Sequence, residues 1–298
     1  LIIFILILMI HIFIIILYGI LISIFIIFFC MKNPLIEYNF PKKPDSPLIY
    51  SFPHSGRDYK NTISNKTALK NNDQRISEDF YVDKIFSNLI NKNTFFIKAK
   101  FPRCYVDVNR SRYEIDARLF KNIPENYEII ESAYNISGFG VIPRKVSSEK
   151  DLYDSLLPFE EYKNRIARVY NDWHDITENL IQKSLSNFGV AFLIDCHSMP
   201  SEISFSSSSA LPDFVIGNLF GDSSEKSFNY ELKKQIKYLN YSISFNKPFS
   251  GNYILKRHSR KKEGINAVQV EINRSLYIEE KTLKLKIKAF KKLQKNIN

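Results

Sequence analysis

Apolar residues along the chain gather in short runs that end on polar side chains, and the clearest run extends from Val190 to Ile194. It follows Gly189 and stops at Asp195, Cys196 and His197. An unbroken apolar run of this length is typical of a strand that is covered on both faces of a sheet. Such sheets bind ligands at the carboxyl ends of their strands. Because side chains alternate along a strand, Asp195 and His197 share one side and Cys196 faces the core on the other.

Similar patterns predict the remaining strands and the main helix. Strands are expected at residues 47–52, 94–99 and 267–272, where apolar and β-branched residues concentrate. A long helix is expected from Phe159 to Asn187, since apolar side chains recur there at helical spacing and a glycine follows as a stop. Strands that alternate with helices favour an α/β fold with a mostly parallel or mixed central sheet flanked by helices.

Three further segments are assigned from local signals. Ser77 can cap a helix that would carry Asp79 in its first turn. The serine-rich stretch 204–209 is expected to be a mobile loop beside the site. The lysine-rich tail from Lys281 is expected to form a solvated amphipathic helix.

The first thirty residues differ from the rest because they contain no charged side chain. A helix of that length would exceed the ~30 Å of the bilayer's hydrocarbon core, so a genuine membrane anchor is one interpretation. The basic start and small-residue cleavage site of a secretory signal are missing. We favour translated upstream sequence ahead of Met31, which opens an ordinary cytoplasmic amino terminus, and a single catalytic domain over residues 31–298. A membrane partner is expected only if residues 1–30 are genuine.

Charge and cysteine content limit the classes of binding partner and the cellular compartment that we expect. The formal charge of +11 is spread along the chain without a recognisable nucleic-acid-binding motif, so no nucleic-acid partner is expected. An anionic small-molecule substrate is compatible with that charge. Cys30, Cys104 and Cys196 lack the spacing of a disulfide framework or a thiolate zinc site, which fits a reducing cytoplasmic compartment. The oligomeric state has no signal in the sequence.

Polar residues of metal-ligand type stand at three element ends: His54 after the first strand, Asp79 near a helix start and His197 after a central strand. Two histidines and one carboxylate leave a zinc ion one open position for water, as hydrolytic zinc sites require. Glu271, on the strand expected at 267–272, would then act as the base. A structural role is the alternative for any single histidine here, and the wide spacing has none of the diagnostic strength of a compact metal motif.

Longer strings around these residues resemble the N-formylglutamate amidohydrolase family. The matches follow the family's order and cover nearly everything from about Pro47 to Glu280: PHSG at 53–56, SEDFYVDKIF at 77–86, DVNR at 107–110, GFGVIPR at 138–144, LIDCHSMP at 193–200 and VQVEINRSLY at 268–277. The resemblance implies a phosphorylase/hydrolase-like fold related to zinc carboxypeptidases. It implies one Zn²⁺ bound by His54, Asp79 and His197, with Glu271 as the base. Asp58 and Glu78 are the alternatives to Asp79.

The resemblance also suggests how a substrate with two carboxylates would bind. Arginine suits a carboxylate because its planar fork binds both oxygens. The Asn109-Arg110 pair resembles the pair that holds the substrate carboxylate in carboxypeptidase relatives, and Asp107 would orient Arg110. Arg144 and Arg274 are second choices, with a surface position or an internal ion pair as the alternative.

Three more residues are candidates of lower rank. Asp195 would support His197 by fixing its tautomer, as metal-bound histidines usually require. His174, on the long helix, has a site role or a packing role. His258 lies among basic residues and would either stabilise the oxyanion of a tetrahedral intermediate or have no part in the reaction.

The sequence therefore predicts a zinc-dependent hydrolase of a C–N amide bond other than a peptide bond, which converts N-formyl-L-glutamate to formate and L-glutamate. The first alternative is a related N-acyl amino acid deacylase or a small zinc carboxypeptidase. The second is a catalytically degenerate, membrane-tethered binding protein.

Overall fold

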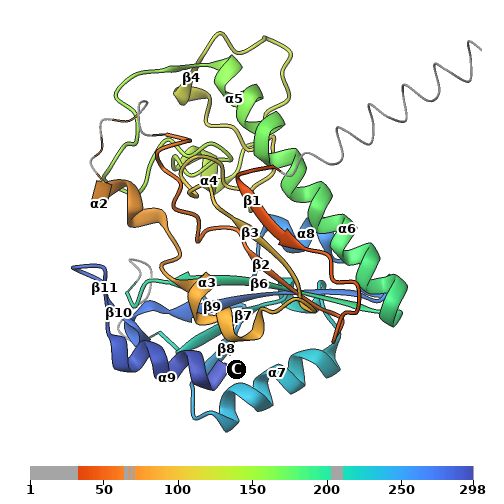
Figure 1. Ribbon diagram of the computed structural model, residues 1–298. Helices are drawn as coiled ribbons and strands as arrows, with labels where there is room; N and C mark the ends of the chain where they lie inside the picture. Colours follow the sequence, from red (N-terminus) through yellow and green to blue (C-terminus); the bar gives the residue numbers. More distant parts are fainter. Residues whose placement is uncertain (1–32, 64–66, 68, 70, 203–210, 298) are drawn as a thin grey trace, which may run out of the picture. The chain divides into compact units, whose positions relative to one another are not determined.

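A mixed β-sheet organises the fold (Figure 1). The structure is a computed structural model that describes residues 33–63, 67, 69, 71–202 and 211–297. Leu35–Asn298 pack as one unit. Within the described ranges the main sheet has seven strands in the order β1-β3-β2-β6-β9-β7-β8. Their bounds are β1 Ile36–Asn39, β2 Leu48–Phe52, β3 Phe95–Ala99, β6 Ala191–Met199, β7 Phe214–Gly217, β8 Ile243–Phe245 and β9 Ile265–Asn273.

The four central strands are parallel, as expected of a sheet covered on both faces. β3, β2, β6 and β9 pair in parallel, β1 is antiparallel to β3, β7 is antiparallel to β9, and β8 is parallel to β7. Two small sheets pair β4 (Phe120–Lys121) with β5 (Leu157–Pro158) and β10 (Ile278–Glu279) with β11 (Lys284–Leu285). The predicted α/β class with a mixed sheet is confirmed.

Helices cover both faces of the main sheet (Figure 1). The predicted long helix consists of α5 (Phe159–Arg165), a π-helical segment (Ile166–Tyr170) and α6 (Asn171–Phe188), and it ends at Gly189 in a left-handed conformation as expected. α6 and α8 (Tyr253–His258) lie on one face, and α3 (Val82–Ile85), α7 (Lys226–Tyr238) and α9 (Ile287–Ile297) lie on the other. The remaining helices are the short α2 (Asn71–Gln74) and α4 (Ala133–Ile136).

Alternation along β6 sends its side chains into two different cores. Leu193 packs with Trp173 and Ile181 of α6, and all three are fully buried. Ile194 and Cys196 pack in the opposite core, so the expected orientation of Cys196 is confirmed. Burying side chains of this size contributes about 1.5–3 kcal/mol each, which fixes the face that each position presents.

Three predicted boundaries are wrong. β6 does not stop at its apolar run but continues through Met199, so His197 lies within the strand and not after its end. No helix begins at Ser77, because that residue ends a short 3-10 turn and α3 starts only after Tyr81, whose φ of 57° is left-handed. Asp79 consequently lies in the connection between them. The tail helix is present as α9 but begins later than Lys281.

Two predictions fall on residues outside the described ranges: the apolar segment Leu1–Cys30 and the serine-rich stretch 204–209. Among the described residues, no helix combines the length and the apolar character needed to cross a membrane.

Candidate metal centre and active site

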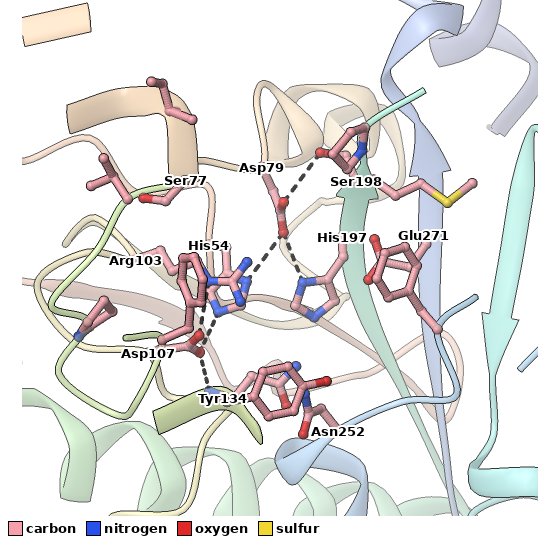
Figure 2. A pocket seen from close by; sticks show the side chains of 18 of the residues that line it. His54, Ser77, Asp79, Arg103, Asp107, Tyr134, His197, Ser198, Asn252 and Glu271 are labelled. Carbon is pink, nitrogen blue, oxygen red and sulfur yellow. Dashed lines mark hydrogen bonds and ion pairs between the residues drawn. The ribbon is translucent and has the colours of Figure 1, made fainter. Parts of the chain in front are cut away.

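His54, Asp79 and His197 come together as a buried cluster (Figure 2). One ligand atom from each lies within 4.8 Å of the others. Nδ1 of His197 lies 2.9 Å from Oδ2 of Asp79, and Nδ1 of His54 lies 3.4 Å from the same oxygen. His54 follows the end of β2, and the backbone N–H of Asp79 donates to the His54 carbonyl at 3.0 Å, which holds the connection before α3 against the sheet.

The far nitrogen of each histidine contacts a carboxylate. Nε2 of His54 lies 2.8 Å from Asp107 Oδ1, and Nε2 of His197 lies 2.7 Å from Asp195 Oδ2. Asp195 also accepts a hydrogen bond from Ser51 at 2.7 Å. A carboxylate at Nε2 fixes the tautomer that carries its proton there, so the Nδ1 lone pair is directed at the cluster.

The donor set fits a divalent metal ion. Two imidazole nitrogens and one carboxylate oxygen are ligands that zinc accepts, and they leave a fourth position open. In the described part of the chain, Nδ1 of His54 is buried and has no hydrogen-bond partner. An orphaned buried nitrogen is costly unless something binds it, and a metal ion at the centre of the cluster would do so.

Electrostatics keep the carboxylate of the cluster ionised. Burial by itself would raise the pKa of Asp79, but interactions with the His197 and His54 rings outweigh it and hold that pKa well below its usual range. Burial would likewise raise the pKa of Asp107, and the charges of Arg103 and His54 hold it well below its usual range. Both carboxylates are therefore anionic at neutral pH.

Glu271 lies beside the cluster without belonging to it. In the parallel pairing of β6 and β9, Glu271 is the register partner of His197, so both side chains project from the same face. Gln269 donates a hydrogen bond to Oε1 of Glu271 at 2.8 Å. Burial raises the pKa of Glu271, which brings this carboxylate closer to the value that a base needs at neutral pH.

A cavity of about 420 Å³ opens over the cluster. Of the predicted site residues, those that line it include His54, Asp79, Asp107, Asn109, Arg110, His197, Glu271 and Arg274. Its size and its mixture of apolar walls with a few convergent polar groups are typical of a small-molecule site.

Arg110 is prepared to bind an anion from this cavity. Its side chain is buried, and its Nε and Nη1 donate to the carbonyls of Phe139 and Asn109 at 3.2 and 3.0 Å. Its guanidinium carbon lies 3.6 Å from the centre of the Tyr134 ring. Asn109 in turn accepts from the backbone N–H of Ile254 at 2.8 Å. These contacts fix the guanidinium plane without neutralising its charge.

The family model for N-formylglutamate amidohydrolase matches residues 46–278. The chain belongs to this family. N-formylglutamate deformylase of Pseudomonas putida is 24% identical over 238 residues, which span 78% of this chain and 82% of that protein. The enzyme of the same name from Pseudomonas aeruginosa is 22% identical over 243 residues, 80% of this chain and 85% of that one. A crystal structure of N-formylglutamate amidohydrolase from Ralstonia eutropha JMP134 aligns with a TM-score of 0.81 and 26% identity, covering 88% of this chain and 94% of that one.

Membership of the N-formylglutamate amidohydrolase family is thus shown over the region that carries every candidate site residue. The alternatives to Asp79 as a ligand lie outside the cluster. Glu78 is buried, and its Oε1 accepts hydrogen bonds from Nε of Arg75 at 2.9 Å and from the Tyr59 hydroxyl at 2.7 Å. Asp58 binds the side chain of Asn61 in its own turn.

The structure does not bring Arg144 to the site of this amidohydrolase. Its Nε lies 2.9 Å from Asp116 and its Nη1 lies 2.7 Å from Asp151, and it is not among the described residues that line the cavity. The expected alternative, an internal ion pair, is what the structure contains. Arg274 does line the cavity, but it donates to Ser198 at 3.1 Å and to Asp79 at 3.3 Å, so it supports a candidate ligand.

His174 and His258 also lie away from the cavity lining that the structure describes. They are buried and stacked, with Nδ1 of His174 2.9 Å from Nε2 of His258. Burial lowers the pKa of both rings. Their geometry is that of a packing contact between α6 and α8, and it gives no support to an oxyanion role for His258.

Two cations that line the cavity were missed by sequence reasoning. Arg103 donates to Asp107 at 3.0 Å, and Lys145 follows directly after Arg144 in the chain. Arg103 precedes Asp107 by four residues in the same connection, and this short separation in the sequence is a signal that could have identified it. Lys145 has no comparable signal, because which of two adjacent basic residues faces the cavity depends on the turn that carries them.

Proposed function

We propose that this protein hydrolyses N-formyl-L-glutamate to formate and L-glutamate with one bound metal ion. The observation that carries the proposal is the buried cluster of His54, Asp79 and His197 with Glu271 beside it, in a cavity that also exposes Arg110. Curated relatives named N-formylglutamate deformylase support the substrate. The presence of every residue type that the reaction needs argues against a degenerate binding protein.

Zinc is the ion we expect at this centre, held by His54, Asp79 and His197. When bound, it would supply a Lewis acid that polarises the formyl oxygen and lowers the pKa of a water molecule towards ~7. Asp107 and Asp195 hold the two imidazoles in the required tautomer through their contacts with Nε2.

Glu271 acts as the base in this proposal. Its carboxylate takes a proton from water as the oxygen bonds to the formyl carbon. It then passes that proton to the amide nitrogen and the C–N bond breaks. The second proton of the water leaves the new carboxyl group for the amine, so formate and glutamate with a protonated amine are released. Arg110 holds a substrate carboxylate and so orients the amide against the metal and the base.

The test couples metal analysis to product detection on the purified full chain. Formate release from N-formyl-L-glutamate is compared with hydrolysis of N-acetyl-L-glutamate and N-succinyl-L-glutamate, and metal content is measured by elemental analysis. We expect about one zinc per chain and a clear preference for the formyl compound. Preference for a larger acyl group would make the protein a different N-acyl amino acid deacylase. Absence of both bound metal and turnover would overturn the proposal.

A further inference from the structure

Among the described residues, four arginine and lysine side chains line the cavity, and carboxylates pair closely with two of them. Arg103 pairs with Asp107 at 3.0 Å, and Arg274 lies 3.3 Å from Asp79. Arg110 is different, because among the described residues no carboxylate oxygen lies within 4.0 Å of its guanidinium. A buried cation without a close partner favours an anionic ligand.

Lys145 is the second cation that carboxylates leave largely available. Its Nζ lies 3.9 Å from Oδ1 of Asp151, but Arg144 already binds that oxygen at 2.7 Å. The other Nζ contact is a hydrogen bond to the carbonyl of Ser148 at 2.9 Å. An ammonium group has three protons, so this lysine keeps donors for a ligand in the cavity.

The turn at Gly138 positions Lys145. The backbone N–H of Lys145 donates to the Gly138 carbonyl at 3.0 Å. A Cβ at Gly138 would lie 2.9 Å from Cγ and 3.0 Å from Cδ of Lys145, so the missing side chain makes room for the lysine stem. The next residue, Phe139, accepts from Arg110 at 3.2 Å. Consecutive residues of one turn therefore hold Arg110 and Lys145 at the same cavity.

We propose that Lys145 binds the side-chain carboxylate of the substrate while Arg110 binds its α-carboxylate. This inference rests on the proposed function, since N-formylglutamate carries two carboxylates and the cavity offers two cations, Arg110 and Lys145, that the described carboxylates approach no closer than 3.9 Å. Lys145 would then determine the preference for a substrate with an acidic side chain over one with a neutral side chain. A hydrogen bond to a charged group discriminates by about 10- to 100-fold, because the neutral analogue leaves the cation unpaired.

The experiment compares N-formyl-L-glutamate with its neutral isostere N-formyl-L-glutamine in the full-chain protein. Lys145→Met should lower kcat/KM for the glutamate compound by about 10- to 100-fold and leave the glutamine compound nearly unchanged. Lys145→Arg should retain most of the preference. Lys150→Met is the matched control, because Lys150 is near Lys145 in the chain but pairs with Asp73 at 2.6 Å and is not among the described lining residues.

The two substrates separate the possible failures. An equal loss for both would place Lys145 at the α-carboxylate or in a structural role, and an unchanged preference in Lys145→Met would remove it from recognition; either result overturns this inference and leaves the proposed function standing. Absence of formate from both substrates with the wild-type protein would overturn the proposed function and this inference together.

Discussion

His197 and Glu271 are register partners on the central parallel strands β6 and β9. Their side chains project from the same face of the sheet, so a candidate ligand and a candidate base are held side by side by backbone hydrogen bonds. Both are buried, at 3% and 7% exposure. A base carried by a rigid strand needs no loop movement to reach the reacting atoms, which is the arrangement that precise proton transfer favours.

Replacing Glu271 with glutamine should therefore separate catalysis from metal binding. Glutamine keeps an oxygen for the hydrogen bond from Gln269 but cannot take a proton, so kcat should fall by about 10²- to 10⁴-fold with metal content unchanged. Steady-state formate release and elemental analysis measure the two effects. Glu263→Gln is the control, since that side chain is 67% exposed. Retention of more than a tenth of the activity would exclude Glu271 as the base.

If Asp79 is the third ligand, replacing it should reduce the metal content of the protein, whereas replacing Asp58 should not. Asp79→Ala removes the only carboxylate oxygen that the described residues place in the cluster, so the purified variant should retain little or no metal. Asp58→Ala removes a contact with Asn61 and should leave the metal in place. Elemental analysis of both variants decides, and full occupancy in Asp79→Ala refutes the assignment.

Asp107 and Asp195 should tune metal affinity without binding the metal themselves. Their contacts with Nε2 of His54 and His197, at 2.8 and 2.7 Å, fix the tautomers that direct Nδ1 at the cluster. Changing either to asparagine should weaken metal binding by about 10- to 100-fold. Competition with a chelator of known affinity measures the change. Affinity equal to that of the wild-type protein would show that the tautomers are set in another way.

Much of the sheet and the residues on it could be predicted from the sequence, because local patterns determine them. The apolar runs before His54 and around His197 fix buried strands, and alternation then fixes which side chains share a face. The same rule placed Cys196 in the opposite core. Glu271 followed from the alternating strand on which it lies.

What could not be predicted depends on contacts between distant parts of the chain. The left-handed backbone at Tyr81 delays α3 and leaves Asp79 in a connection, and no local pattern signals it. Pairing of His174 with His258 joins residues 84 positions apart. Both lie outside any strand pattern, so hydrophobic periodicity carries no information about them.

The pairing around His258 predicts a specific acid sensitivity. A hydrogen bond from His258, with a further one from Arg260, lowers the pKa of Glu178 to about 2. A lowered folded-state pKa gives stability that is present above the unfolded value of about 4.3 and is lost as the pH falls towards 2. Because Glu178 is 37% exposed, we expect only about 1 kcal/mol.

Urea unfolding of wild type and Glu178→Gln across pH 2 to 6 tests this expectation. The gap between their unfolding midpoints should be largest at pH 6 and should close towards pH 2. Glu160→Gln is the matched control, since Glu160 is 65% exposed and its ion-pair partner within the described residues is Lys163 at 3.2 Å. A gap that does not change with pH would mean that Glu178 contributes through packing and not through its charge.

Arg144 supplies the sharpest contrast between the sequence and the structure. As a substrate anchor it would contact the ligand directly, but the structure has it hold Asp151 at 2.7 Å, while Lys145 lies 3.9 Å from the same carboxylate oxygen. Arg144→Met should therefore release Asp151 to compete for Lys145, and kcat/KM for N-formyl-L-glutamate should fall by several-fold, about 3- to 10-fold for one exposed ion pair.

Adding Asp151→Asn to that variant removes the competing charge and should restore kcat/KM close to the wild-type value. The same second change should not rescue Arg110→Met, whose guanidinium contacts the substrate in the proposed function and has no ion pair with Asp151 in the structure described. Steady-state kinetics of the wild type, of Asp151→Asn alone, of the two other single variants and of the two double variants complete two double-mutant cycles. Restored kcat/KM in the double variant would mean that Arg144 acts through Asp151. Without such recovery, Arg144 would instead hold the substrate or the turn directly.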